Sequence, residues 1–289
     1  MIIFINLIMK VKVAILITLC LINYLNATCS ANQFTGTLTA ADYAAHLAHN
    51  NQKRADISNG KEAGIGGKMC PNGADMNELV YSDELATLAQ GWASTLVTNC
   101  AGLSHNPNRA SKTFSYVGEN VYWGASIQAP TSKSNTLVKA SQAWYAEIKD
   151  FPCTSAAVKT FSSSSGTGVI GHFTQQIWAE TTHIGCGYAL YSDSTGYAYS
   201  EYVVCNYGVG GNMTGSPIYT EGTACSKCKT GTTCSTTMPG ICTTGTTTGT
   251  TTGTTTGTTT GTTTGGTVTA SSRILAISGI LIGFIFFLI

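Results

Sequence analysis

Two histidines, His172 and His183, lie eleven residues apart in the stretch GHFTQQIWAETTHIGCG, on either side of a tryptophan. Histidine is rare in this chain, with five among 289 residues. An imidazole can transfer protons near neutral pH, bind a metal ion through a ring nitrogen, or simply be a hydrogen-bonded group of a core. The stretch therefore leaves catalysis, metal binding and structure open for both residues.

The other side chains of comparable chemistry are scattered along the chain. His105 lies in GLSHNPNR, Glu119 in VGENVYWG and Glu147 in AWYAEI. Taken one at a time, each of them, like His172, favours the simpler interpretation of a satisfied polar group at the edge of an element.

Familiar catalytic motifs give no better lead. Gly166, Gly168 and Gly171 match GxGxxG, but a serine run precedes them and no βαβ unit surrounds them, which argues against a dinucleotide site. The sequence contains neither HExxH nor GxSxG, so it gives no motif support for a common zinc protease or an α/β-hydrolase.

Three helices and one hairpin are expected to position these residues. The first helix starts at the N-cap Thr39 and ends at Gly60. The second begins at Ser82, in SDELATLAQGWASTLV, and the third covers residues 135–148, both with apolar residues at helical spacing. HIGCGYALY and YAYSEYVVCNY flank residues 192–196 and predict a hairpin. Helices followed by a hairpin favour α+β layers.

The N-terminal residues 1–27 predict a cleaved secretion signal. An apolar run, VAILITLCLINYL, follows Lys10 and Lys12 and precedes the small residue Ala27. A retained anchor is the alternative, but the run is shorter than the ~20 residues that span a bilayer. The chain is therefore expected to enter the secretory pathway and act outside the cell.

The C-terminal residues 267–289 predict a glycosylphosphatidylinositol (GPI) attachment signal. ILAISGILIGFIFFLI is apolar to the last residue, and the small residues Gly265 and Gly266 are candidate attachment points. A short single-pass helix is the alternative. Without both ends the chain keeps 12 basic against 14 acidic side chains, and this balance argues against a nucleic-acid partner.

Residues 243–266 repeat threonine with a glycine every four positions. Such a segment has little to bury and is not expected to form a core. It is typical of an O-glycosylated stalk, and an unmodified flexible spacer is the alternative.

Cysteine is abundant for an exported chain, and removal of the signal with Cys20 leaves ten. An even, dense set predicts about five disulfides. Cys225 and Cys228 resemble half of a redox or zinc site, but an oxidising compartment favours a two-disulfide knot over residues 225–242. The ten are Cys29, Cys70, Cys100, Cys153, Cys186, Cys205, Cys225, Cys228, Cys234 and Cys242.

GHFTQQIWAET and YVVCNYGVGGNM resemble the two signature stretches of the CAP superfamily. This group includes cysteine-rich secretory proteins, insect venom allergens, plant pathogenesis-related proteins and the nematode-type secreted venom-allergen-like branch, which this chain resembles. HNNQKRADISNG, YSDELATLAQGWA and GENVYWG resemble the remaining landmarks in the same order, and ACSKCKTGTTC is similar to the family's hinge. The resemblance predicts a CAP domain over residues 39–214 and a cysteine-rich hinge over 215–242.

The resemblance implies a three-layer α-β-α sandwich in which four residues at matching motif positions share one cleft. Two imidazoles and two carboxylates would suit a divalent cation, zinc first, or would share protons with one another when no metal is bound. His183 is outside this set and is expected to have a structural or supporting role. The four implied residues are His105, Glu119, Glu147 and His172.

The resemblance also pairs Cys186 with Cys205, which would join the two strands of the hairpin. A sequon at Asn212 offers an N-glycan where the domain ends. Three departures from the family pattern concern packing and loop shape. They are Gln176 in place of an aliphatic residue, Val209 in place of a frequent proline, and Arg54 one position later than usual after His49.

Three functions remain open. The first is binding of a sterol or other lipid, in an apolar groove between the first and third helices. The second is a metal-dependent hydrolase with Glu119 as base. The third is recognition by a host or cell-surface receptor, with a vestigial cleft. We expect an extracellular, membrane-tethered binding protein rather than an enzyme.

Overall fold

The computed structural model describes residues 38–98, 102–192, 197–245 and 287–288. The helices are α2 (Ala40–Ser58), α3 (Asp83–Thr98), α4 (Lys133–Tyr145), α5 (Ser155–Lys159) and α6 (Gly171–Gln176), with short 3₁₀ turns η1 (Ile65–Gly67) and η2 (Ala146–Asp150). The strands are β1 (Val80–Tyr81), β2 (Val117–Ser126), β3 (His183–Tyr191), β4 (Tyr199–Gly208), β5 (Thr233–Cys234), β6 (Cys242–Thr243) and β7 (Phe287–Leu288).

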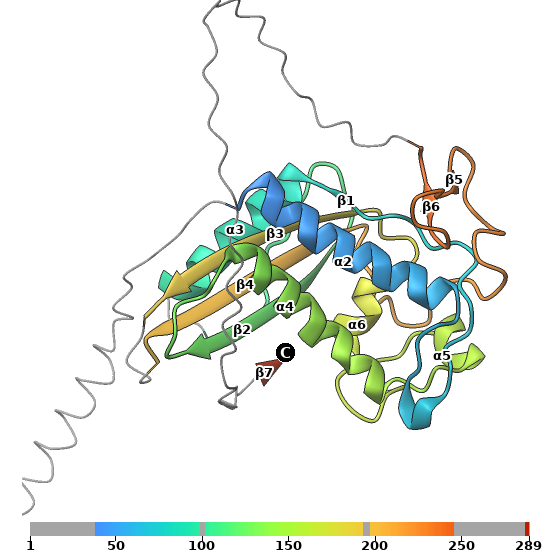
Figure 1. Cartoon of the computed structure of the whole chain (residues 1–289), viewed down its shortest axis with the longest axis horizontal. Coiled ribbons are helices and arrows are strands. Elements are labelled where there is room, and N and C mark those ends of the chain that lie inside the picture. Colours follow the sequence, from blue (N-terminus) through green and yellow to red (C-terminus); the bar gives the residue numbers. More distant parts are fainter. Residues whose placement is uncertain (1–37, 99–101, 193–196, 246–286, 289) are drawn as a thin grey trace, which may run out of the picture.

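The fold is a three-layer α-β-α sandwich, as expected (Figure 1). The central sheet has the order β1-β3-β4-β2-β7, in which β3, β4 and β2 are antiparallel neighbours and β1 runs parallel to β3. Helix α3 covers one face of the sheet, whereas α2 and α4 cover the other. The sheet thus forms a rigid platform with loops at both of its ends.

Helix α3 lies directly on strand β3 because two glycines leave room for it. A Cβ atom added to Gly185 would lie 2.2 Å from the backbone nitrogen of Ala86, and one added to Gly187 would lie 2.3 Å from that of Gln90. The core on this face is built from alanines of the helix and alternate residues of the strands, such as Val121. The close contact fixes the position of α3 on the sheet.

The opposite face of the sheet packs against α2 and α4. Its core contains Tyr122, Trp144 and Tyr207, together with the sulfurs of Cys186 and Cys205. A further apolar cluster lies under α6 and η2 and includes Ile57 of α2. These two clusters hold α6 between the ends of α2 and α4.

The three expected helices and the hairpin are confirmed. Thr39 is the N-cap of α2, and its side chain and Asp42 form the reciprocal bonds of a capping box. The third helix differs in detail: α4 ends at Tyr145, and Glu147 lies in the 3₁₀ turn that continues it. Helix ends often tighten into such turns. The strands β3 and β4 pair over their full length, and the turn residues 193–196 lie outside the described ranges.

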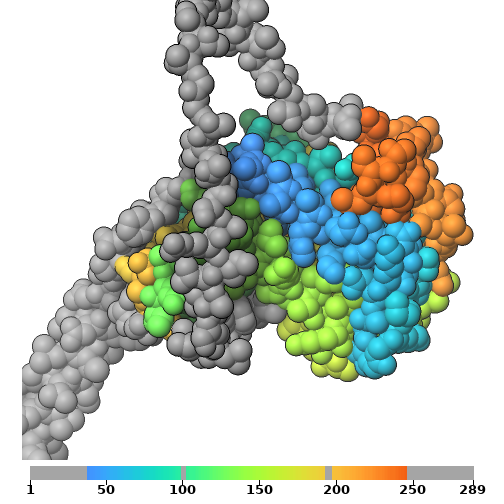
Figure 2. Space-filling view, viewed as in Figure 1, coloured from blue at the N-terminus to red at the C-terminus, as the bar shows by residue number. Residues whose placement is uncertain are grey.

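The predicted two-disulfide knot is confirmed in the hinge, where Cys225 bonds to Cys234 and Cys228 to Cys242. The hinge packs on the main domain, since the amide of Glu78 donates to the Cys242 carbonyl at 2.8 Å and Asn59 donates to the Pro239 carbonyl at 2.8 Å. Figure 2 shows this contact as the orange hinge seated against blue α2.

Two more disulfides lie in the sandwich. Cys70 bonds to Cys153, and Cys186 bonds to Cys205 across the hairpin. The last two of the ten cysteines, Cys29 and Cys100, lie outside the described residues.

The predicted secretion signal lies outside the described residues, as do nearly all of the stalk and the GPI signal with Gly265 and Gly266. Of the GPI signal, only Phe287–Leu288 is described, and it forms a short strand beside β2. Within the described ranges, no helix combines the length and the apolar character needed to cross a membrane.

Candidate functional site

The first histidine–carboxylate pair joins the loop after α3 to strand β2. Glu119 Oε1 accepts a bond from His105 Nδ1 at 2.8 Å and another from the Asn106 amide at 2.9 Å. Arg109 approaches the same oxygen at 3.7 Å. The indole of Trp92, on α3, donates to the Ser104 carbonyl at 2.8 Å and so tethers the loop beside His105. The glutamate is buried, whereas the His105 side chain is 43% exposed.

The second pair joins the 3₁₀ turn η2 to helix α6, and both of its side chains are buried. Glu147 Oε1 accepts a bond from His172 Nδ1 at 2.6 Å. Its other oxygen accepts from the amides of His172 at 2.9 Å and Phe173 at 3.1 Å. Glu147 therefore takes the place of an N-cap for α6, which has no side-chain cap of its own. Trp144 stacks on the His172 ring at a centroid distance of 6.2 Å.

Both pairs orient an imidazole in the same way. Since an ionised carboxylate only accepts hydrogen bonds, each histidine donates from Nδ1, and this leaves Nε2 as the ring atom with a lone pair. His172 Nε2 is buried and has no hydrogen-bond partner among the described residues. A histidine that ligates a metal generally bonds its other ring nitrogen to a carboxylate or carbonyl. The two histidines therefore suit a cation that binds imidazole nitrogen.

A cavity of about 160 Å³ opens at the first pair. Gln175, one turn after His172 on α6, lies across it from the loop and accepts a bond from the Gly211 amide at 2.8 Å. His172 and Glu147 are buried beside this cavity rather than lining it, and Asn120, next to Glu119, donates to the His172 carbonyl at 3.1 Å. The lining residues are His105, Arg109, Tyr116, Gly118, Glu119, Gln175, Gly211 and Asn212.

The four predicted residues thus form two hydrogen-bonded pairs on adjoining elements. Among the described residues, two groups bring three possible ligand atoms within 4.8 Å of one another, and neither includes these four. One group is His46 with Cys186 and Cys205, and the other comprises hinge cysteines. Every cysteine in them is in a disulfide, so neither group offers the thiolate that a metal needs.

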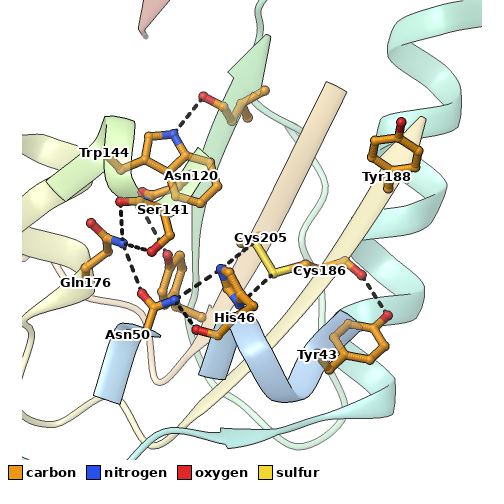
Figure 3. Close-up of a disulfide and its surroundings, with 12 residues drawn as sticks. Tyr43, His46, Asn50, Asn120, Ser141, Trp144, Gln176, Cys186, Tyr188 and Cys205 are labelled. Carbon is orange, nitrogen blue, oxygen red and sulfur yellow. Dashed lines mark hydrogen bonds between the residues drawn. A yellow bond between two sulfur atoms is a disulfide. The ribbon is translucent and has the colours of Figure 1, made fainter. Parts of the chain in front are cut away.

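The contact between α2 and α4, where an apolar groove was expected, contains apolar side chains such as Leu47 and Leu137 and also buried polar groups (Figure 3). Gln176 Nε2 donates to Asn50 Oδ1 at 3.0 Å and to Ser141 Oγ at 2.7 Å. Asn50 also bonds to His46, which packs on the Cys186–Cys205 disulfide. Burial lowers the pKa of His46 to about 3, so this ring is neutral.

Sequence reasoning missed the role of Arg54. Its buried guanidinium donates to five backbone carbonyls at 2.8–3.3 Å, and burial lowers its pKa to about 9. These bonds tie α2 to the C-terminal end of α6 and to the segment that leads into β3. An arginine within the apolar stripe of a helix is the signal that could have revealed it. The accepting carbonyls belong to Asn77, Gln176, Trp178, Ala179 and Thr181.

Two other predicted residues have clear surroundings. His183, at the start of β3, shares a hydrogen bond with Thr182 at 2.8 Å, and its ring lies 5.2 Å from that of Phe114, away from the cavity. Asn212, the sequon residue, lines the cavity. Its Nδ2 donates to the Gly171 carbonyl and its Oδ1 accepts from Thr174, both at 2.7 Å.

Comparison with known proteins gives consistent matches. The family described as "CAP: Cysteine-rich secretory protein family" matches residues 40–207. Scoloptoxin SSD976 of Scolopendra dehaani is 39% identical over 194 residues, which cover 66% of this chain and 79% of the relative. Venom allergen 5 of Polistes dominula is 35% identical over 176 residues, 61% of this chain and 70% of the relative.

Two solved structures share the fold. BmVAL-1 has a TM-score of 0.59 at 27% identity, over 72% of this chain and 96% of that one. A structure of NaASP2 with Zn²⁺ has a TM-score of 0.53 at 27% identity, over 71% of this chain and 96% of that one.

Proposed function

The chain belongs to the CAP family of cysteine-rich secretory proteins, and on that premise we propose that it is an extracellular binding protein, not an enzyme. Its cleft holds a divalent cation, zinc first, through the imidazoles of His105 and His172. A partner protein, such as a host or cell-surface receptor, is recognised at the same face.

One observation carries the cation proposal: the Nε2 of His172 is buried, and no hydrogen-bond partner reaches it from the part of the chain that the structure describes. A neutral polar atom in that state costs free energy unless something binds it. Glu147 and Glu119 hold the two rings by Nδ1, which selects the tautomer that leaves Nε2 available. The zinc in the related NaASP2 structure supports the same choice of ion. When bound, zinc would supply a localised positive charge at the cleft.

The carboxylates of these pairs are poorly placed for hydrolysis. A general base needs a free oxygen within reach of the attacking water. Glu119 Oε1 already accepts two bonds, and Oε2 faces the amide of Asn206 at 3.2 Å once that amide is oriented to satisfy its neighbours. Glu147 accepts three bonds in a buried site. Both glutamates therefore orient histidines instead of accepting protons from water.

Zinc titration of the purified full-length protein by isothermal calorimetry tests the proposal. We expect stoichiometric zinc binding that His105→Ala and His172→Ala abolish. Glu147→Gln should weaken it by about 10–100-fold, as loss of a supporting carboxylate does elsewhere. His183→Ala is the matched control, because this histidine lies outside the cleft, and it should bind zinc normally. Normal binding by His172→Ala would contradict the proposal.

Exposed apolar side chains favour a protein partner at this face. Tyr116 lines the cavity and is 42% exposed. Val209 and Met213, which are 38% and 49% exposed, flank the lining residues Gly211 and Asn212. Apolar side chains gathered at a polar cleft are typical of recognition surfaces. Neutralisation of Arg109, beside them, by Arg109→Gln should change the partner's association rate.

Sterol or lipid binding is the weaker proposal for this chain. Two of the cavities among the described residues measure about 160 and 210 Å³, and each is below the ~300–1,000 Å³ of typical ligand pockets. The α2–α4 contact would have to break buried hydrogen bonds to open. Native mass spectrometry distinguishes the two proposals. A co-purified lipid mass that extraction removes and added sterol restores would favour lipid carriage over the receptor proposal.

We also propose that residues 267–289 are replaced by a GPI anchor, on the sequence evidence given above, with residues 243–266 as the stalk. Phosphoinositide-specific phospholipase C should release the protein from intact cells. Retention on the cell surface after this treatment would instead favour a single-pass helix.

A further inference from the structure

A cavity of about 210 Å³ lies at the end of β2 that is remote from the cleft, and the two share no lining residue. It is bounded by the end of β2, the loop 128–131, helix α4 and the start of β4. The cavity therefore lies where the N-terminal half of α4 passes over the sheet (Figure 1). Its volume equals that of about seven water molecules at ~30 Å³ each, which is the size of one small polar ligand.

Gly124 creates part of this space. It lies opposite Glu201 in the pairing of β2 with β4. Because side chains alternate along a strand, Gly124 shares its face with Tyr122, which belongs to the core under α2 and α4. A Cβ atom added to Gly124 would lie 2.6 Å from the Tyr122 hydroxyl. The glycine thus leaves this position of the sheet without a side chain, beside the carboxylate of Glu201.

Glu201 brings a buried carboxylate to the cavity, and the residue is only 8% exposed. Its Oε1 accepts hydrogen bonds from the hydroxyls of Thr136 and Tyr188, both at 3.0 Å. These two bonds fix the direction of the carboxylate. Its Oε2 accepts no hydrogen bond from the residues that the structure describes. A buried acceptor of this kind favours a ligand that donates hydrogen bonds.

The charges at the cavity balance. The half-buried Lys139 of α4 also lines it, and the lining contains no charged side chain besides Lys139 and Glu201. Burial raises the pKa of Glu201, while the hydrogen bonds from Thr136 and Tyr188 and the positive charge of Lys139 lower it. An ionic ligand would be attracted by one of the two charges and repelled by the other. A neutral ligand rich in hydrogen-bonding groups is therefore favoured.

The rest of the lining combines amide, hydroxyl and apolar groups. Asn135 Nδ2 donates to Thr131 Oγ1 at 3.0 Å, which ties the loop 128–131 to the start of α4. The exposed side chain of Gln128 offers both a donor and an acceptor. Ala129 and the ring of Tyr199 add apolar surface. Hydroxyl groups around a ring of C–H bonds match this mixture.

The chemistry of the lining excludes two other roles. Glycoside hydrolysis generally uses a pair of carboxylates, and Glu201 is the single carboxylate here. The same count is too low for a divalent cation that binds as calcium does, with six or more oxygen ligands. The cavity is therefore suited to bind a neutral ligand without transforming it.

We propose that this cavity binds one neutral hexopyranose ring, either as a free sugar or as the terminal residue of a glycan. Hydroxyl groups of the ring donate to Glu201 Oε2 and form hydrogen bonds with the side chains of Gln128 and Asn135. Its C–H face lies against Ala129. The site is separate from the cation cleft and gives the protein a second recognition surface, for carbohydrate.

The test adds D-glucose, D-galactose, D-mannose or N-acetyl-D-glucosamine to the purified full-length protein and measures binding by saturation-transfer NMR of the sugar protons. Thermal shifts are unsuitable, because sugars excluded from a protein surface stabilise it without binding. We expect at least one sugar to bind with roughly millimolar affinity, as the size of the ligand allows. Failure of all four to bind would overturn the proposal.

Analogues of the best binder test the chemistry. At least one deoxy derivative should bind about tenfold more weakly or worse, because it leaves Glu201 Oε2 without its donor. The matching uronic acid should also bind more weakly, since its carboxylate would face that of Glu201. Equal affinity of all the deoxy derivatives would contradict the proposal. Binding of the methyl glycoside would identify a glycan terminus as the source of the ligand, and its exclusion would identify the free sugar.

Variants locate the site. Ala129→Trp places a large side chain at an exposed edge of the cavity and should abolish sugar binding, whereas Ala48→Trp, at an exposed position of α2, should leave it unchanged. Glu201→Gln should weaken binding about tenfold through the loss of a charged acceptor, and Glu180→Gln, at an exposed residue, should not. Sugar binding that persists in Ala129→Trp would overturn the proposal even if Glu201→Gln failed to fold.

Discussion

Replacement of Arg54 by methionine removes the guanidinium that joins α2 to the end of α6, and we expect it to be among the most damaging single changes in the domain. Methionine keeps an unbranched apolar side chain and cannot donate a hydrogen bond. The side chain donates to five carbonyls, of which that of Ala179 also accepts from Asn77 and that of Trp178 from the Thr181 amide. Three carbonyls, those of Asn77, Gln176 and Thr181, have no other hydrogen bond among the described residues.

The cost follows from those three carbonyls. A buried acceptor left without a partner costs ~1–3 kcal/mol, so three of them cost about 3–9 kcal/mol. Removal of a buried charge offsets part of this, because a desolvated guanidinium is itself unfavourable. The net loss in the free energy of unfolding should be about 3–6 kcal/mol, a large share of the ~5–15 kcal/mol typical of a domain.

Urea denaturation followed by tryptophan fluorescence measures this loss, with the disulfides intact. Lys53→Met is the matched control: it is one residue away on α2, its side chain is 30% exposed, and its ion pair with Glu62 at 2.8 Å is worth about 1 kcal/mol or less. Arg54→Lys should fall between the two, since an ammonium reaches fewer carbonyls. A loss for Arg54→Met no larger than that of the control would refute the reasoning.

Three further changes test other parts of the structure. The pKa of His46 is about 3 when folded and ~6.5 when unfolded, so its stabilising effect is complete above pH ~6.5 and is lost as pH falls toward 3. Urea titrations should show a loss of up to ~1.4 kcal/mol per pH unit, with a shallower slope in His46→Gln. Gly187→Ala should destabilise by at least ~1–3 kcal/mol because its Cβ meets the α3 backbone, whereas Gly91→Ala, with open space around it, should stabilise by up to ~1 kcal/mol. A glycan on Asn212 should lower zinc affinity, because its amide bonds to Gly171 beside His172, and Thr214→Ala should restore it in glycosylating cells. Equal zinc affinity of the two glycoforms would contradict this.

Local patterns were enough to predict the elements. Thr39 and Asp42 act within one helical turn, and the alternation in β3 and β4 depends only on which face of a strand is buried. Glu119 and Glu147 were predicted from their motif positions. Their pairing, Glu119 with His105 and Glu147 with His172, could not be predicted from the sequence. That pairing depends on backbone amides supplied by elements far apart in the chain.

The residues whose roles could not be predicted all form hydrogen bonds with partners that lie far away along the chain. Arg54 bonds to carbonyls more than a hundred residues away, and Glu201 meets Thr136 only because α4 folds back over the sheet. Gln176 stood out as a departure from an aliphatic position, and its reason is the polar partners on α2 and α4. A polar residue in an apolar stripe can be seen in the sequence, but its partners require the fold.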